Sequence, residues 1–217
     1  MPDRKIHGLY LLTDERYLGT AVYLSTIERC LKAGVDVLQF RNKSFSLEER
    51  KRVALWLKEM CARHNVPFIV NDSATLAAEV GADGVHIGES EIEFAVARKI
   101  VGDKAIIGVS CEGSIESAKR LQDSGANYVS FGACFKSPTK PESPIINLAM
   151  LAEAKQSLKV PVVAIGGITP KNADAVLRTG VDAIAVISGV LKANNPANAV
   201  KAYKEVFLRL AQPAATG

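Results

Sequence analysis

Three basic side chains, Arg41, Lys43 and Lys140, could together bind an anion. Arg41 and Lys43 follow Gln39 at spacings of two and four residues, and an extended backbone turns alternate side chains to one face. Most Lys and Arg side chains are simply solvated. Cations that share one concave site repel each other unless a polyanion lies between them. If the three converge, the pattern therefore favours a ligand such as a pyrophosphate.

Two glycine-containing segments could bind a phosphate group. GGITP at 166–170 follows an apolar run and opens a predicted helix, with Thr169 as N-cap and Pro170 in the first turn. ISG at 187–189 also places a glycine and a hydroxyl residue directly after an apolar run. Glycine lets backbone N–H groups approach a phosphate closely. Either segment alone is a common turn, but in neighbouring loops they predict a phosphate site.

Two carboxylates, Asp72 and Glu91, follow successive predicted strands, and Asn71 adjoins the first. Paired carboxylates can do acid–base chemistry. They can also hold Mg²⁺, which takes one or two carboxylates together with substrate phosphate oxygens. The cationic residues nearby favour the metal. For Asp72 an N-cap of the following helix is the competing interpretation.

Other reactive residue types carry less information. His86 lies between apolar neighbours, which favours a buried, hydrogen-bonded histidine over a catalytic one. Cys111 and Cys134 have no clear histidine partner, so core thiols are expected.

Short β-branched runs alternate with segments of helical period along the chain. The predicted strands are 8–13, 35–41, 67–71, 83–87, 105–110, 127–132, 160–166 and 182–188. The predicted helices are 22–32, 47–64, 74–80, 92–101, 115–124, 148–158, 171–179 and 198–210. Strict alternation with apolar strands predicts a parallel sheet covered by helices.

A weak repeat precedes every second strand: a glycine, a small apolar residue, then Asp or Asn. Its copies begin at Gly34, Gly81, Gly125 and Gly180. Each glycine suits the left-handed position that ends a helix. A doubly wound open sheet would also use such stops. Eight βα units favour a closed α/β barrel of the (β/α)₈ TIM type, a single domain over 1–217 with a disordered tail at 212–217. In such a barrel the chemistry lies at the carboxyl ends of the strands.

Composition limits the class of protein. The chain has 217 residues, 48% hydrophobic and 23% charged, with a formal net charge of +4, which excludes disordered, collagen-like and disulfide-scaffold classes. No apolar run approaches the roughly 20 residues of a membrane span. The four cysteines have no C-x-x-C spacing. No signal-peptide core is present, so a cytoplasmic protein is expected. The mild charge predicts no nucleic-acid partner, and a homo-oligomer is compatible with the sequence.

The ordered motifs resemble the thiamine-phosphate synthase (thiamine-phosphate pyrophosphorylase) family over nearly the whole chain. They are LYLLTD (9–14), QFRNK (39–43), ND (71–72), ADGVHIG (82–88), GVS (108–110), SPTK (137–140) and VAIGGITP (163–170). The resemblance implies a (β/α)₈ barrel that joins hydroxymethylpyrimidine pyrophosphate to hydroxyethylthiazole phosphate with Mg²⁺ and releases pyrophosphate. Its partners would be these phosphorylated small molecules.

The resemblance also implies roles for individual residues. Gln39 would face the pyrimidine, and the catalytic residues would be Arg41, Lys43 and Lys140. The residues that it assigns to the pyrophosphate are Arg41, Lys43, Asn71, Ser110 and Lys140. Those that it assigns to the thiazole phosphate are Ser137, Thr139, Gly167, Ile187 and Ser188. Asp72 would ligate the metal, and Glu91 would take the place of a second metal-binding aspartate.

Three acidic residues depart from the family pattern: Glu89, Glu91 and Glu112. Glu91 keeps a carboxylate on a longer side chain, and Glu112 stands where relatives often have histidine. A related thiazole tautomerase, which generally lacks the pyrophosphate-binding residues and uses that histidine, is one alternative. A non-catalytic paralogue that binds the pathway's ligands is another.

Overall fold

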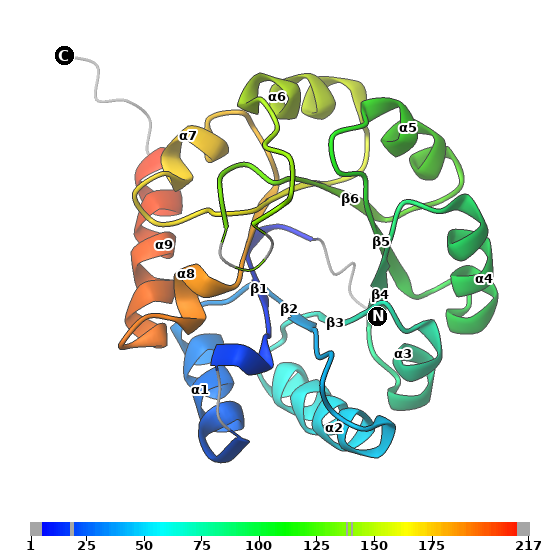
Figure 1. The fold of residues 1–217 in the computed structure, drawn as a ribbon, viewed down its shortest axis with the longest axis vertical. Coiled ribbons are helices and arrows are strands. Elements are labelled where there is room, and N and C mark those ends of the chain that lie inside the picture. Colours follow the sequence, from blue (N-terminus) through cyan, green and yellow to red (C-terminus); the bar gives the residue numbers. More distant parts are fainter. Residues whose placement is uncertain (1–5, 18–19, 138, 140, 212–217) are drawn as a thin grey trace.

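The computed structural model describes residues 6–17, 20–137, 139 and 141–211. In these residues eight parallel strands close into a barrel in chain order, with β1 paired to β8. Figure 1 shows the strands at the centre and the helices around them. The strands are Gly8–Leu12 (β1), Val37–Phe40 (β2), Phe68–Asn71 (β3), Gly84–Ile87 (β4), Ile106–Ser110 (β5), Tyr128–Phe131 (β6), Val162–Ile165 (β7) and Ala183–Val186 (β8). The predicted single-domain (β/α)₈ barrel is confirmed.

Helices alternate with these strands. They are Thr20–Ala33 (α1), Leu47–Arg63 (α2), Ala74–Val80 (α3), Glu91–Val101 (α4), Ile115–Asp123 (α5), Leu148–Ser157 (α6), Ala173–Leu177 (α7), Ser188–Leu191 (α8) and Pro196–Ala211 (α9), with a 3-10 turn at Glu15–Tyr17 (η1). Ser46 and Glu49 form a reciprocal capping box at the start of α2. No described helix has the length and apolar character that crossing a membrane requires.

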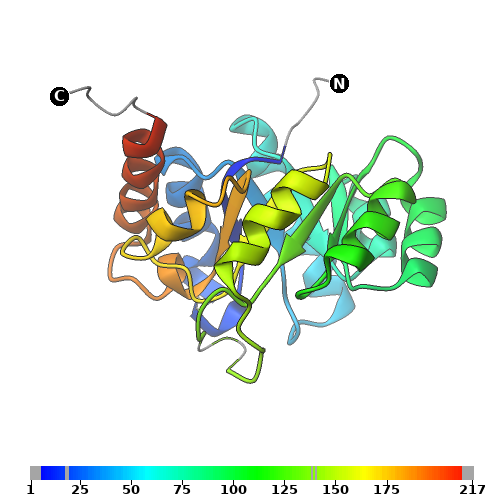
Figure 2. The ribbon, with the colours of Figure 1, turned by 90° about the horizontal axis from the view of Figure 1, so that it is seen from above.

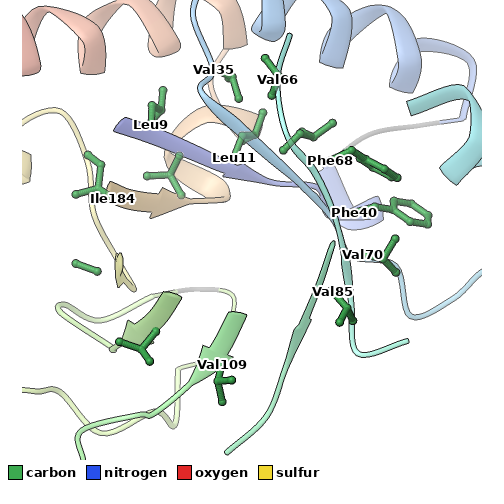
Figure 3. Close-up of a cluster of buried hydrophobic side chains, with 14 of the residues drawn as sticks. Leu9, Leu11, Val35, Phe40, Val66, Phe68, Val70, Val85, Val109 and Ile184 are labelled. Carbon is green, nitrogen blue, oxygen red and sulfur yellow. The ribbon is translucent and has the colours of Figure 1, made fainter. Parts of the chain in front are cut away.

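Alternation along the strands produces two apolar layers. Outward residues such as Leu9, Phe68 and Val109 pack between barrel and helices, and Figure 3 shows this layer. Inward residues such as Tyr10, Ile69 and Val163 fill the barrel itself. Because successive side chains of a strand point to opposite faces, each strand supplies both layers. Side chains at alternate strand positions therefore point into the barrel, where polar groups among them can meet.

The glycine repeat has a physical role in the fold. Its four glycines have positive φ, at 111°, 63°, 99° and 85° in chain order, which confirms them as left-handed stops. The Asp or Asn two residues later accepts a hydrogen bond from the first or second residue of the preceding strand: Asp36 from Leu9, Asp83 from Phe68, Asn127 from Ile107 and Asp182 from Val162, at 2.7–2.8 Å. Each copy therefore joins an odd-numbered strand to the next strand.

Two predictions about the chain after β7 and β8 need correction. The helix expected at 171–179 is α7, which begins only at Ala173, with Asn172 rather than Thr169 as N-cap. Pro170 lies in the preceding turn. The short helix α8 was not expected, because its four residues are too few to show a helical period. The tail at 212–217 lies outside the described residues.

Candidate functional site

A cavity opens at the carboxyl ends of the strands, among the loops that follow them. In Figure 2 the long β6–α6 connection, coloured yellow-green, extends beyond the barrel at one end. Nine of the residues proposed from sequence line this cavity: Gln39, Arg41, Asn71, Ser110, Ser137, Thr139, Gly167, Ile187 and Ser188. They come from six different strand ends, so barrel closure brings them together.

Arg41 is held at the rim by the end of β1. Its backbone N–H donates to Thr13 Oγ1 at 2.9 Å, and Thr13 Oγ1 donates to Arg41 O at 3.1 Å. Its Nη1 lies 3.3 Å from Asp14 Oδ2, and the Arg41 side chain is only 13% exposed. Asp14 is fully buried and also binds Arg16 at 2.6 Å. The end of β1 therefore fixes both the backbone and the guanidinium of Arg41.

The arginines set the charge state of Asp14. Burial alone raises the pKa of this carboxyl. Hydrogen bonds and charge from Arg16, together with the charge of Arg41, outweigh burial and hold the pKa below its ordinary value. Asp14 is therefore ionised at neutral pH and serves as a permanent counter-charge.

Lys43 does not follow the expected alternation. Strand β2 ends at Phe40, so the extended backbone that would have turned Lys43 inward is absent. Lys43 is exposed, is not part of the cavity lining, and its backbone N–H donates to Glu15 Oε1 at 3.1 Å. The inward orientation predicted for Gln39 and Arg41 thus does not extend to Lys43. The remaining predicted cation, Lys140, lies outside the described residues.

The structure describes the side chain of one predicted metal ligand, Asp72, but not that of the other, Glu91. Asp72 directly follows cavity residue Asn71, is exposed, and has a left-handed φ of 61°. Ser73 caps α3, since its hydroxyl accepts from Leu76 N at 3.2 Å, so the N-cap interpretation of Asp72 is excluded. Glu91 begins α4, but its side chain lies outside the described part. Among the side chains that are described, no three His, Cys, Asp or Glu cluster to hold a metal.

The glycine-rich loop after β7 packs tightly against the β6–α6 connection. Gly167 has φ of 61°, and an added Cβ would lie 2.4 Å from Lys136 O and 2.7 Å from Phe135 O. Asn172 Nδ2 donates to Gly167 O at 3.1 Å, while Asn172 Oδ1 accepts from Thr169 N at 2.7 Å. The side chain of Asn172 therefore clamps the loop that glycine makes possible.

The floor of the cavity is a chain of hydrogen-bonded side chains that cross the barrel. Gln39 Nε2 donates to Tyr10 OH at 2.9 Å, and Tyr10 OH lies 2.7 Å from Tyr128 OH. Tyr128 OH lies 2.9 Å from His86 Nδ1, and His86 Nε2 lies 2.9 Å from Ser110 Oγ. The prediction of a buried, hydrogen-bonded His86 is confirmed, and this histidine also lines the cavity.

Sequence reasoning missed two members of this floor, Tyr10 and Tyr128. Both are almost fully buried and line the cavity. Tyr128 shares strand alternation with Ser130, another lining residue, so the pattern of β6 held a signal for it. Glu112 also lines the cavity and has a positive φ of 45°. A search for hydroxyl side chains at the inward-facing positions of the predicted strands would have identified both tyrosines of the floor.

The cysteines behave as core thiols. All four are buried, and none is joined in a disulfide. Burial raises the pKa of the Cys111 and Cys134 thiols to about 12. Thiolates are the nucleophilic form, so neither residue is suited to covalent catalysis, in agreement with the sequence prediction.

Sequence comparison finds relatives that match nearly the whole chain and share one name. It is 42% identical over 202 residues to thiamine-phosphate synthase of Nitrosococcus oceani, covering 93% of each chain. It is 42% identical over 200 residues to the protein of that name in Methylococcus capsulatus, covering 92% of this chain and 89% of the other. The corresponding protein of Acidithiobacillus ferrooxidans is 38% identical over 208 residues, covering 94% of this chain and 96% of the other.

Structure comparison agrees. Thiamine phosphate pyrophosphorylase from Pyrococcus furiosus superposes with a TM-score of 0.87 at 32% sequence identity, covering 96% of this chain and 99% of the other. The sequence model of the family described as thiamine monophosphate synthase matches residues 9–190. The chain therefore belongs to the thiamine monophosphate synthase family.

Proposed function

We propose that the protein is a thiamine-phosphate synthase, a transferase that joins hydroxymethylpyrimidine pyrophosphate to hydroxyethylthiazole phosphate. The observation that carries this proposal is the convergence of nine predicted substrate-binding residues on one cavity in a chain 38–42% identical to curated synthases. Both substrates are charged and do not cross membranes unaided, so we place the activity in the cytoplasm.

The lining of the cavity differs from one side to the other, which suits two different substrates. Arg41, Asn71 and Ser110 lie on β2, β3 and β5 or just beyond, and we assign them to the pyrophosphate. Gly167 and Ser188 follow β7 and β8, where barrels of this kind commonly bind phosphate, and we assign them to the thiazole phosphate. Lys43 and Lys140 complete the proposed cation set, Lys43 by moving inward from its exposed position.

The proposed reaction transfers a pyrimidine methylene group. Its carbon–oxygen bond to the pyrophosphate breaks, and the electron pair leaves with the pyrophosphate. The lone pair of the thiazole nitrogen then forms the new carbon–nitrogen bond. Because no activated nucleophile lines the described cavity, we propose direct transfer in which cleavage runs ahead of attack. Arg41, held by Asp14, would stabilise the charge that develops on the leaving group.

We propose Mg²⁺ as the cofactor, with Asp72 as a ligand and Glu91 as a second. The carboxylate of Asp72 has no ion pair or side-chain hydrogen bond within the described residues and stands beside cavity residue Asn71. Mg²⁺ commonly uses few protein carboxylates and completes its shell with substrate phosphates and water, which fits this sparse donor set. When bound, the ion would neutralise pyrophosphate charge. Asp72→Asn and Glu91→Gln should each raise the Mg²⁺ concentration for half-maximal rate.

A coupled assay tests the function directly. Purified protein with both substrates and Mg²⁺ should yield thiamine phosphate and pyrophosphate in equal amounts. Arg41→Ala should lower the rate roughly 10²- to 10³-fold without unfolding the protein. Arg178→Ala is the matched control, because its guanidinium pairs with Asp174 on outer helix α7 and should leave the rate unchanged. Folded wild-type protein that forms no thiamine phosphate would contradict the proposal, and isomerisation of a thiazole phosphate alone would favour the tautomerase.

A further inference from the structure

In the hydrogen-bonded chain on the cavity floor, one buried atom has no partner among the described residues. Gln39 is 2% exposed, and its Nε2 donates to Tyr10, yet no described residue donates a hydrogen bond to its Oε1. A buried carbonyl oxygen without a donor costs free energy in a folded protein. Since Gln39 lines the cavity, this oxygen is available to accept a hydrogen bond from a bound ligand.

The direction of donation along the chain follows from counting protons. Burial raises the pKa of the Tyr10 and Tyr128 phenols, so each keeps its single proton at neutral pH. Tyr10 OH accepts from Gln39 Nε2, and its other described contact is Tyr128 OH. Its proton is therefore donated to Tyr128, because otherwise it would be buried without an acceptor.

The same count continues to the far side of the barrel. Tyr128 OH, having accepted from Tyr10, donates its own proton to His86 Nδ1. A neutral imidazole with Nδ1 as acceptor carries its proton on Nε2. His86 Nε2 then donates to Ser110 Oγ at 2.9 Å. The Ser110 hydroxyl proton is left for a ligand in the cavity.

Packing holds the central members of this chain in place. The rings of His86 and Tyr128 stack at 28° with centroids 5.4 Å apart. Gly108, the register partner of Tyr128 on β5, leaves room for the ring, because a Cβ at that position would lie 1.9 Å from Tyr128 Cζ. Packing therefore fixes the Tyr128 ring, and with it the position of its hydroxyl oxygen between Tyr10 and His86.

We infer that Tyr10, Tyr128 and His86 are positioning residues that fix Gln39 Oε1 as an acceptor and the Ser110 hydroxyl as a donor. This inference rests on the proposed function, in which Gln39 faces the pyrimidine and Ser110 the pyrophosphate, and it adds the residues that orient both groups. An acceptor in the floor selects a pyrimidine ring that carries an N–H donor, such as an exocyclic amino group. A donor at Ser110 suits the pyrophosphate oxygens. The chain thereby couples recognition of the two ends of one substrate.

Substitutions of Tyr10 or Tyr128 in the hydrogen-bonded chain should weaken the selection of the amino group and leave the rest of the cavity lining in place. In Tyr128→Phe the Tyr10 proton loses its acceptor and is drawn to Gln39, which favours the flipped amide with Nε2 toward the ligand. In Tyr10→Phe the amide loses the acceptor that orients it. Tyr23→Phe is the control for selection of the amino group, because it removes a buried phenol hydroxyl on α1, beside the end of β1 and outside the hydrogen-bonded chain of the floor.

The experiment compares kcat/KM for the aminopyrimidine pyrophosphate with that for its des-amino analogue. A des-amino substrate leaves the buried Gln39 acceptor unpaired, which costs free energy, so wild type should prefer the amino form by about 100-fold. We expect the preference to fall to about tenfold or less in Tyr128→Phe and Tyr10→Phe and to stay at the wild-type value in Tyr23→Phe. An unchanged preference for the amino form in both folded variants, Tyr128→Phe and Tyr10→Phe, would overturn the inference.

A second measurement needs no turnover. ¹⁵N NMR of histidine-labelled wild-type protein, with the His86 signals assigned through His86→Gln, should show the proton of His86 on Nε2. A proton on Nδ1 would overturn the direction of the chain. Wild-type protein that makes no thiamine phosphate would refute the proposed function instead, and the tautomer of His86 would still decide whether the donor chain exists.

Discussion

Replacing Gly167 by Ala puts a methyl group where two carbonyl oxygens already lie. The added carbon would be 2.4 Å from Lys136 O and 2.7 Å from Phe135 O, closer than such atoms can approach. Gly81 is a matched control, because its φ of 63° is close to the 61° of Gly167 and the nearest atom to its Cβ is the flexible Lys58 Nζ, at 3.6 Å. Both substitutions share the left-handed backbone cost, about 1–2 kcal/mol. The collision adds about 1–3 kcal/mol at Gly167 alone.

The difference should also appear in binding. Relief of the collision must move the β7–α7 loop away from the β6–α6 connection, and both loops line the cavity. We expect Gly167→Ala to raise KM for the thiazole phosphate at least tenfold, equivalent to about 1.4 kcal/mol, while Gly81→Ala leaves it unchanged. Urea unfolding measures the stabilities, and steady-state kinetics measures KM. Equal stability losses together with equal KM values for the two variants would refute the close-packing argument.

Three further predictions concern charge and thiols. Asp14→Asn should lower the free energy of unfolding at pH 7 by about 2 kcal/mol. Because the folded pKa of Asp14 is depressed, wild type should lose this advantage as pH falls below about 4. A difference in unfolding free energy between wild type and Asp14→Asn that stays constant down to acid pH would contradict the role of Asp14. Lys140→Ala should slow turnover by roughly 10²-fold or more in a protein with wild-type circular dichroism, and a wild-type rate would remove Lys140 from the site. The four buried cysteines should resist a thiol reagent at pH 8 in native protein and react after unfolding; rapid labelling of the native state would show an open thiol.

Local spacing determined much of this protein. The alternation of apolar runs with helical periods predicted every strand of the barrel, because a buried parallel strand and an amphipathic helix each have a short-range signature. The repeated glycines predicted the helix stops, since a left-handed residue is a local requirement. Gln39 and Arg41 were placed correctly by alternation on one strand end. These features depend on residues a few positions apart.

The tertiary structure decided what depends on distant parts of the chain. Lys43 lies outside the cavity lining because β2 ends three residues before it. Where a strand ends depends on its pairing with the neighbouring strands. The donor chain joins Tyr10 to Tyr128, which are 118 residues apart, and no spacing rule connects them. The requirement for glycine at 167 comes from carbonyl oxygens of another loop. Barrel closure creates these contacts, because it brings into one cavity side chains that the sequence keeps apart.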